Sequence, residues 1–271
     1  MEEAYLKIAV TAALQAGNDI LKIYNDPQSD FQIEKKADNS PLTIADKAAH
    51  KTIVSYLEQT PFPVLSEEGK NIPYEERRVW PDLWIVDPLD GTKEFIKRNG
   101  EFTVNIALVR QGNPILGVIY IPVLKTLYYS SESGGAFKVS DIEYSETLSW
   151  DEMCAQRRKL PLPEAHEGTV IVASRSHLSP ETETFIEEIK AKQGAVTLKS
   201  SGSSIKICLV AEGTADIYPR FAPTMEWDTA AGHAIAKGAG REIYQVSSNL
   251  PLRYNKTELI NPWFIVEPKR L

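Results

Sequence analysis

Hydrophobic residues recur at helical spacing over two stretches in the first part of the chain. Apolar side chains every three or four positions predict an amphipathic helix over residues 2–24. The same pattern predicts a second helix from about Leu42 to Gln59, and Thr43 with Asp46 resembles a capping box at its start. The chain is therefore expected to begin with two helices.

Continuous apolar runs follow these helices and predict strands. Residues 62–65 and 82–87 each form a short apolar run that ends next to carboxylates. Between residues 103 and 139, apolar runs alternate with the turn-forming residues Gly112-Asn113-Pro114 and Pro122. This alternation predicts an antiparallel meander.

A polar segment that contains two prolines, residues 150–168, comes next, and we interpret it as a linker. After it, strands and helices alternate. The expected strands are 170–173, 196–198, 215–218, 243–246 and 263–266, and the expected helices are 180–192, 203–212 and 228–237. The prediction is an α/β protein with an α+β lobe over residues 1–155 and an α/β lobe over residues 156–271.

Composition narrows the class of protein. The chain has 271 residues, of which 42% are hydrophobic and 25% charged, so it can build a core and is not of a disordered type. Its net charge of −7 argues against a binder of duplex nucleic acid. No apolar run approaches the roughly 18 residues of a membrane span, the start Met1-Glu2-Glu3 is not basic, and two cysteines cannot build a disulfide framework. We expect a cytoplasmic protein, with or without peripheral attachment to an inner membrane. Because the chain is acidic, we expect metal ions to hold any anionic partner.

The segment from Asp87 to Thr92 carries the strongest chemical signal. An apolar strand delivers Asp87 to its end, where α/β sheets commonly bind ligands, and Asp90 returns close to it. These carboxylates, the carbonyl of Leu89 and the amides of Gly91 and Thr92 suit a divalent cation and a phosphate. The alternative is an ordinary Asp-Gly turn.

Three other carboxylates lie at the ends of predicted elements. Glu67 follows a short strand, with Glu68 beside it, and Asp228 begins a helix. Asp46 lies in the first turn of the second helix. Each also has an ordinary structural explanation, as a solvated acidic pair, a helix N-cap and the capping partner of Thr43 respectively.

Together these motifs resemble one family, the lithium-sensitive, magnesium-dependent inositol monophosphatase superfamily. Three strings carry the resemblance: Leu65-Ser-Glu67-Glu68, Asp87-Pro-Leu-Asp90-Gly-Thr92 and Trp227-Asp228-Thr-Ala-Ala-Gly. Three more resemble its 3′(2′),5′-bisphosphate nucleotidase branch of sulfur assimilation: Lys93-Glu94-Phe95, Phe102-Thr-Val-Asn-Ile-Ala-Leu-Val and Tyr218-Pro-Arg220-Phe-Ala-Pro-Thr. The resemblance covers essentially the whole chain and implies the layered α/β/α/β/α sandwich of the inositol monophosphatase and fructose-1,6-bisphosphatase type.

The resemblance also implies a site for two to three Mg²⁺ ions. Glu67, Asp87 and the carbonyl of Leu89 would hold the first ion. Asp87, Asp90 and Asp228 would hold the second, and Glu67 would face a third through water. Four carboxylates crowded together repel one another unless cations lie between them, so electrostatics independently favours a metal site here.

Two residues with catalytic roles follow from the same resemblance. Asp46 with Thr92 resembles the pair that orients and deprotonates a water activated by the first ion. The second ion would stabilise the leaving oxygen, as in two-metal phosphoryl transfer. The amides of Gly91 and Thr92 would hold the phosphate.

Substrate recognition is expected in the second lobe. Ser203 is expected to open a helix with Lys206 one turn later, so both could meet an anion at its N-terminus. The resemblance assigns them, with Arg220, to the uncleaved phosphate and the nucleotide, and assigns His177 to adenosine; Asp228 would also face the substrate. The alternatives are a serine cap and a lysine on a solvated face.

The implied activity is hydrolysis of the 3′-phosphate of adenosine 3′,5′-bisphosphate to AMP and phosphate, with phosphoadenylyl sulfate as a second candidate substrate. Two alternatives are an inositol phosphatase and a non-catalytic nucleotide sensor. The complete metal-binding and water-activating set argues against the sensor. The oligomeric state is left open.

Overall fold

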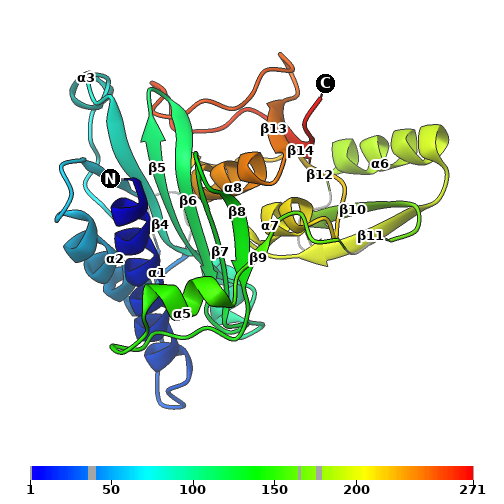
Figure 1. The fold of residues 1–271 in the computed structure, drawn as a ribbon. Coiled ribbons are helices and arrows are strands. Elements are labelled where there is room, and N and C mark those ends of the chain that lie inside the picture. Colours follow the sequence, from blue (N-terminus) through cyan, green and yellow to red (C-terminus); the bar gives the residue numbers. More distant parts are fainter. Residues whose placement is uncertain (1, 36–40, 164–165, 175–178, 271) are drawn as a thin grey trace.

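The computed structural model describes residues 2–35, 41–163, 166–174 and 179–270. Its helices are α1 (Glu2–Tyr24), α2 (Ile44–Leu57), α3 (Tyr74–Arg77), α4 (Thr92–Ile96), α5 (Trp150–Ala155), α6 (Pro180–Gln193), α7 (Ile205–Glu212) and α8 (Glu226–Gly238). Helices and sheets lie in alternating layers (Figure 1). Helices α1 and α2 form the first layer and a large sheet the second. Helices α7 and α8 follow, then two smaller sheets, and finally α6. The expected layered sandwich is confirmed.

The large sheet has seven strands in the order β3-β4-β5-β6-β7-β8-β9. They are β3 (Val64–Ser66), β4 (Asp82–Asp90), β5 (Thr103–Arg110), β6 (Asn113–Ile121), β7 (Thr126–Ser131), β8 (Gly135–Val139) and β9 (Arg158–Lys159). Only β3 and β4 pair in parallel, and the remaining neighbours are antiparallel. The predicted meander is thus confirmed in β5 to β8.

The smaller sheets contain the strands expected in the second lobe. They are β10 (Thr169–Ser174), β11 (Val196–Ser201), β12 (Tyr218–Arg220), β13 (Arg241–Gln245) and β14 (Phe264–Pro268). Strands β10 and β11 are parallel, whereas β12, β14 and β13 form an antiparallel sheet in that order. A short hairpin, β1 (Glu34–Lys35) with β2 (Pro41–Leu42), lies before α2.

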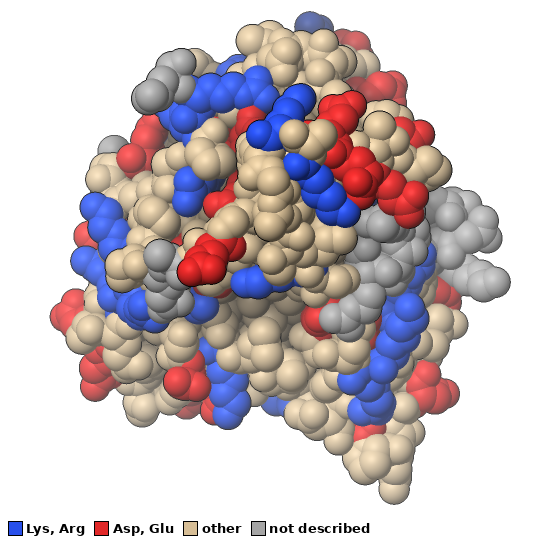
Figure 2. All heavy atoms as spheres, turned by 90° about the vertical axis from the view of Figure 1, so that its right-hand side faces the viewer, with Lys and Arg blue, Asp and Glu red and all other residues tan. Residues whose placement is uncertain are grey.

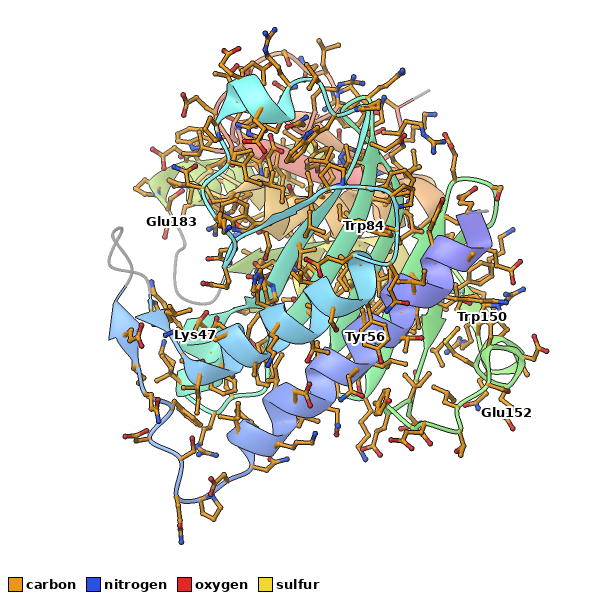
Figure 3. All side chains as sticks on the ribbon, turned by 90° about the vertical axis from the view of Figure 1, so that its left-hand side faces the viewer. Lys47, Tyr56, Trp84, Trp150, Glu152 and Glu183 are labelled. Atoms are coloured by element: carbon orange, nitrogen blue, oxygen red, sulfur yellow. The ribbon has the colours of Figure 1, made fainter. Side chains whose placement is uncertain are left out.

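Two hydrophobic cores cover the two faces of the large sheet. Alternating strand residues point to opposite faces, so Trp84 packs toward α1 and α2 while its neighbour Ile85 packs toward α7 and α8. In Figure 3, α1 and α2 lie side by side in front of the sheet. Helix α5 lies beside α1, where Trp150 faces the ammonium group of Lys7. The sheet is therefore buried on both sides, which fixes its position between the α1–α2 layer and the α7–α8 layer.

The expected linker at residues 150–168 is wrong in its first part. Ser149 caps α5 and forms a capping box with Glu152, and β9 then pairs with β8 at the edge of the large sheet. The polar composition of α5 reflects its exposed position rather than a lack of structure. The division into lobes at residue 155 stays a prediction, although β9 lies just beyond it in the first sheet.

Two strand boundaries also differ from expectation. The hairpin between β5 and β6 turns at Gln111 and Gly112, which both have positive φ. Asn113 and Pro114 therefore belong to β6 and not to the turn. The strand expected at 215–218 begins at Tyr218, because only an isolated bridge from Ile217 to β10 precedes it.

Charges of both signs are mixed on the surface. On the face shown in Figure 2, Lys and Arg alternate with Asp and Glu, and the described residues form no continuous basic stripe there. This pattern does not favour a polyanion such as a nucleic acid on that face. No helix in the described part of the chain is long and apolar enough to cross a bilayer.

Helix α8 packs closely on the large sheet because Gly117 of β6 has no side chain. A Cβ at Gly117 would lie 2.3 Å from the carbonyl oxygen of Ala231 and 2.9 Å from Cβ of Ala234. We expect Gly117→Ala to push α8 away from the sheet and to lower the free energy of unfolding by about 3 kcal/mol, the upper end of overpacking penalties. Urea denaturation monitored by tryptophan fluorescence measures this loss.

Ser130→Ala is the matched control. Ser130 pairs with Gly117 across β6 and β7, and its buried hydroxyl has no hydrogen-bond partner among the described residues. Removing an unpaired hydroxyl breaks no hydrogen bond, so the control should retain full stability. Equal stability of both variants would contradict the close packing of α8 at Gly117.

Candidate active site

The end of β4 brings two carboxylates together. Pairing with β5 shifts register between Asp87 and Asp90, and the N–H of Leu89 donates to Oδ1 of Asp87 at 3.1 Å. Gly91 then adopts φ +95°, and a Cβ there would lie 3.3 Å from Cβ of Ser203. Glycine is required both for this left-handed turn and for the close approach of the second lobe.

A third carboxylate reaches this turn from α8. One oxygen each of Asp87, Asp90 and Asp228 lie within 4.8 Å of one another. Asp228 was expected at the N-cap, but Met225 occupies that position and Asp228 is the N3 residue. Oδ2 of Asp228 accepts a hydrogen bond from the N–H of Met225 at 2.8 Å, which orients the carboxylate at the start of the helix. The two predicted lobes thus meet at this cluster.

The clustered carboxylates are difficult to ionise together. Burial, followed by the charges of Glu67, Asp90 and Asp228, raises the pKa of Asp87 well above its ordinary value. Burial and the charge of Asp90 raise the pKa of Asp228 to about 8. Glu67 follows β3, where its N–H donates to the carbonyl of Val86 at 3.1 Å. Hard oxygen donors with excess negative charge fit Mg²⁺, which would relieve the repulsion.

Asp46 and Thr92 also meet at this site. Oγ1 of Thr92 lies 3.2 Å from Oδ1 of Asp46 and 3.4 Å from the carbonyl of Leu89. Oδ2 of Asp46 accepts from the N–H of Thr43 at 2.7 Å and from its hydroxyl at 2.5 Å. One carboxylate therefore caps α2 with one oxygen and bonds Thr92 with the other. The capping explanation and the catalytic prediction are compatible.

A cavity of about 410 Å³ adjoins the carboxylates and is lined from both lobes. The first lobe contributes Asp90, Gly91, Lys93, Glu94 and Lys97, and the second contributes Ser201, Gly202, Ser203, Ser204, Lys206, Ile207, Tyr218, Arg220, Thr224, Asp228, Thr229 and Phe264. Four lysine or arginine side chains thus border a cavity that also reaches Asp90 and Asp228 of the carboxylate cluster. A molecule with two anionic groups matches this arrangement, with cations at the acidic end.

The two basic residues predicted in the second lobe differ in their freedom to bind a ligand. Lys206 is only 5% exposed, which excludes a solvated face. Its ammonium group donates to the carbonyl oxygens of Ser203 at 2.6 Å and Ser201 at 3.3 Å, and burial lowers its pKa to about 8. Arg220 donates from Nη2 to the carbonyl of Pro223 at 3.2 Å, while its buried Nε has no partner within the described ranges. Arg220 is therefore the freer donor.

The expectation that Ser203 opens a helix is wrong. Helix α7 begins at Ile205 with Ser204 at the N-cap position, and Ser203 has φ +41°. The N–H of Gly202 donates to Oε2 of Glu101 at 2.9 Å, which draws this loop toward the first lobe. The buried hydroxyl of Ser203 finds no partner among the described residues. His177 lies outside the described residues.

Sequence analysis missed two residues beside the carboxylates. The hydroxyl of Ser204 lies 2.7 Å from Oδ2 of Asp90, and Nδ2 of Asn105 donates to Oγ of Ser204 at 2.9 Å. An amide side chain in the middle of an apolar strand was the available signal for Asn105. Nothing in the sequence separates Ser204 from the serines around it.

The chain is similar to known proteins over almost its whole length. The sequence profile described as "Inositol monophosphatase family" matches residues 1–266. The 3′(2′),5′-bisphosphate nucleotidase CysQ of Salmonella typhimurium is 45% identical over 257 residues, which are 94% of this chain and 96% of that protein. CysQ of Escherichia coli strain K12 shows the same identity and coverage.

Solved structures agree with the sequence relatives. CysQ from Bacteroides thetaiotaomicron, a bacterial member of the inositol monophosphatase family, superposes with a TM-score of 0.92 and 61% identity over 99% of this chain and 98% of that one. The extragenic suppressor protein SuhB from Bartonella henselae superposes with a TM-score of 0.70 and 26% identity over 98% and 94%. The resemblance stated from the motifs is confirmed, and the chain belongs to the inositol monophosphatase family.

Proposed function

We propose that this protein is a magnesium-dependent 3′(2′),5′-bisphosphate nucleotidase that hydrolyses the 3′-phosphate of adenosine 3′,5′-bisphosphate to AMP and phosphate. The observation that carries this proposal is one cavity lined by Asp90 and Asp228 of the carboxylate cluster and by the basic residues Lys206 and Arg220. A substrate with two separate phosphates fits both features. The names of the CysQ relatives support the same activity.

The family resemblance implies the metal ligands, and the three carboxylates that meet at the site support them. Glu67, Asp87 and the carbonyl of Leu89 would hold one Mg²⁺, and Asp87, Asp90 and Asp228 a second; a third would face Glu67. Bound Mg²⁺ would supply charge neutralisation at the phosphate and acidify coordinated water. The raised pKa values of Asp87 and Asp228 support this assignment, because burial and the neighbouring carboxylates both disfavour their ionised forms, and a bound cation would offset this.

The protein's own groups handle the proton and orient the phosphate. Thr92 donates its hydroxyl proton to Oδ1 of Asp46, which leaves the threonine lone pairs to accept from the attacking water. Asp46 is the terminal base, and its other oxygen is occupied by Thr43. The amides of Gly91 and Thr92 would hold the scissile phosphate. Arg220 and Lys206, with Ser203, would hold the second one.

The choice between nucleotide and inositol substrates is tested by phosphate release. We expect rapid release from adenosine 3′,5′-bisphosphate, slower release from inositol 1-phosphate, and none after magnesium is chelated. Phosphoadenylyl sulfate is expected to be a second substrate, because it carries the same 3′-phosphate. A preference for inositol 1-phosphate would favour an inositol phosphatase, and no release from any substrate would favour a nucleotide sensor.

The carboxylate cluster makes stability depend on pH when magnesium is absent. Asp87 and Asp228 bind protons more tightly in the folded than in the unfolded chain, so the free energy of unfolding should fall as pH rises from about 4 toward the pKa of about 8 of Asp228. Added magnesium should restore the lost stability at pH 8, since it binds the folded state. Urea midpoints measured in chelator and in magnesium test this dependence.

Asp87→Asn is the control for this measurement. It removes the carboxylate with the most like-charged neighbours. The free energy of unfolding should therefore fall less as pH rises, and magnesium should raise it less. Phosphate release should drop by orders of magnitude. Comparing the two proteins cancels the contribution of buried His233, whose lowered pKa acts in the opposite direction. A magnesium response unchanged in Asp87→Asn would overturn the metal assignment.

Arg220 separates substrate recognition from chemistry. A charge-assisted contact to the second phosphate is worth about 2 kcal/mol, so Arg220→Ala should lower kcat/KM for adenosine 3′,5′-bisphosphate by roughly thirtyfold. The same variant should hydrolyse 3′-AMP almost as the wild type does, because that substrate has no second phosphate. Equal losses on both substrates would assign Arg220 a structural role.

A further inference from the structure

The loop between β11 and α7 reaches across the lobes to a carboxylate of the first one. The N–H of Ser204 donates to Oδ2 of Asp90 at 2.6 Å, and its hydroxyl lies 2.7 Å from the same oxygen. That hydroxyl also lies 2.8 Å from the carbonyl oxygen of Asp228. Ser204 therefore contacts two residues of the proposed second cation site, through the carboxylate of Asp90 and the backbone of Asp228.

A second residue fixes the orientation of this hydroxyl. Asn105 of β5 donates from Nδ2 to Oγ of Ser204 at 2.9 Å and lies 3.5 Å from Oδ2 of Asp90. The hydroxyl of Thr103 donates to Oδ1 of Asn105 at 2.9 Å, which fixes the orientation of the amide. Asn105 occupies a lone pair of Ser204, so the single hydroxyl proton points to Asp90 or to the backbone of Asp228. Both Ser204 and Asn105 are buried.

Ser204 does not perform the usual task of a serine at its position. Serine at an N-cap normally accepts a hydrogen bond from the first turn of the helix. Ser204 is the N-cap residue of α7, yet its side chain makes no capping hydrogen bond. The hydroxyl is directed instead to the carboxylate of Asp90 and the backbone carbonyl of Asp228. Oδ1 of Asp90 has no hydrogen-bond partner in the described part of the chain, so Oδ2 carries the contacts that orient this carboxylate.

We propose that Ser204, held by Asn105, is a positioning residue that aligns Asp90 for the second cation. This inference rests on the proposed metal site. Residues that hydrogen-bond a metal-ligating carboxylate fix its orientation, and their loss typically weakens metal binding by about 10–100-fold. The neighbouring residue Ser203 lines the cavity. The loop between β11 and α7 would therefore contact the substrate through Ser203 and the metal ligand Asp90 through Ser204.

Manganese binding to the substrate-free protein tests the proposal without using activity. Electron paramagnetic resonance counts bound Mn²⁺, and we expect at least two ions per wild-type chain. Ser204→Ala keeps the backbone N–H but loses the hydroxyl, so one class of site should weaken about tenfold while the tighter class stays unchanged. Asn105→Ala removes the hydrogen bond that orients the Ser204 hydroxyl, so it should weaken the same class of manganese site. It replaces Ser204→Ala in the test if that variant does not fold.

Ser203→Ala is the matched control. It removes a neighbouring buried hydroxyl that has no partner among the described residues, so manganese affinity should equal that of the wild type. Wild-type affinity in both Ser204→Ala and Asn105→Ala would overturn the inference and leave the proposed function intact. Equal weakening of every site would also overturn it, since Ser204 would then only support the fold. A wild-type protein that binds no Mn²⁺ would overturn the inference and the metal-dependent function together.

Discussion

The repulsion between clustered carboxylates is the constraint on which this structure depends. Asp87 and Asp90 lie at a turn in the first lobe and Asp228 at the start of α8, with oxygens within 4.8 Å of one another. Like charges at this separation destabilise the fold unless protons or cations neutralise them. The scaffold must therefore hold the carboxylates in place at a cost in stability. Such a cost is typical of a site built to bind a cation.

Rigid packing supplies the force that holds the carboxylates together. Strand β4 lies inside the large sheet, between β3 and β5, and both of its faces are covered by helices. Helix α8 approaches the same sheet over Gly117, where even a methyl group would collide with its backbone. Neither element can retreat without breaking a hydrophobic core. The position of Asp228 relative to Asp87 is thus set by side chains that are distant from the chemistry.

Several side chains serve the local fold and the site together. Asp46 closes the first turn of α2 with one oxygen and bonds Thr92 with the other. Lys206 donates hydrogen bonds to backbone carbonyls in the loop that lines the cavity. A substitution at either residue would disturb the structure and the binding of substrate at once. Arg220, whose Nε is unpartnered within the described ranges, is the basic residue with fewer structural contacts.

The features with a local signal could be predicted from the sequence. Helical periodicity is sufficient for α1, and the spacing from Asp87 to Asp90 predicts that two carboxylates meet after a strand, although the register shift that achieves this inside β4 was not predicted. Strand β9 could not be found, because a two-residue strand has no periodicity and exists only through pairing with β8. Ser204 contacts Asp90 across 114 positions, a contact that only tertiary packing creates. Helix α7 also begins two residues later than expected, at Ile205 instead of Ser203.

Anomalous scattering from a crystal grown with manganese would test the cation site directly. The proposal predicts an anomalous peak bounded by the oxygens of Asp87, Asp90 and Asp228, and a second peak between Asp87, Glu67 and the carbonyl of Leu89. The absence of any peak at the cluster, with the carboxylates sharing protons instead, would contradict it.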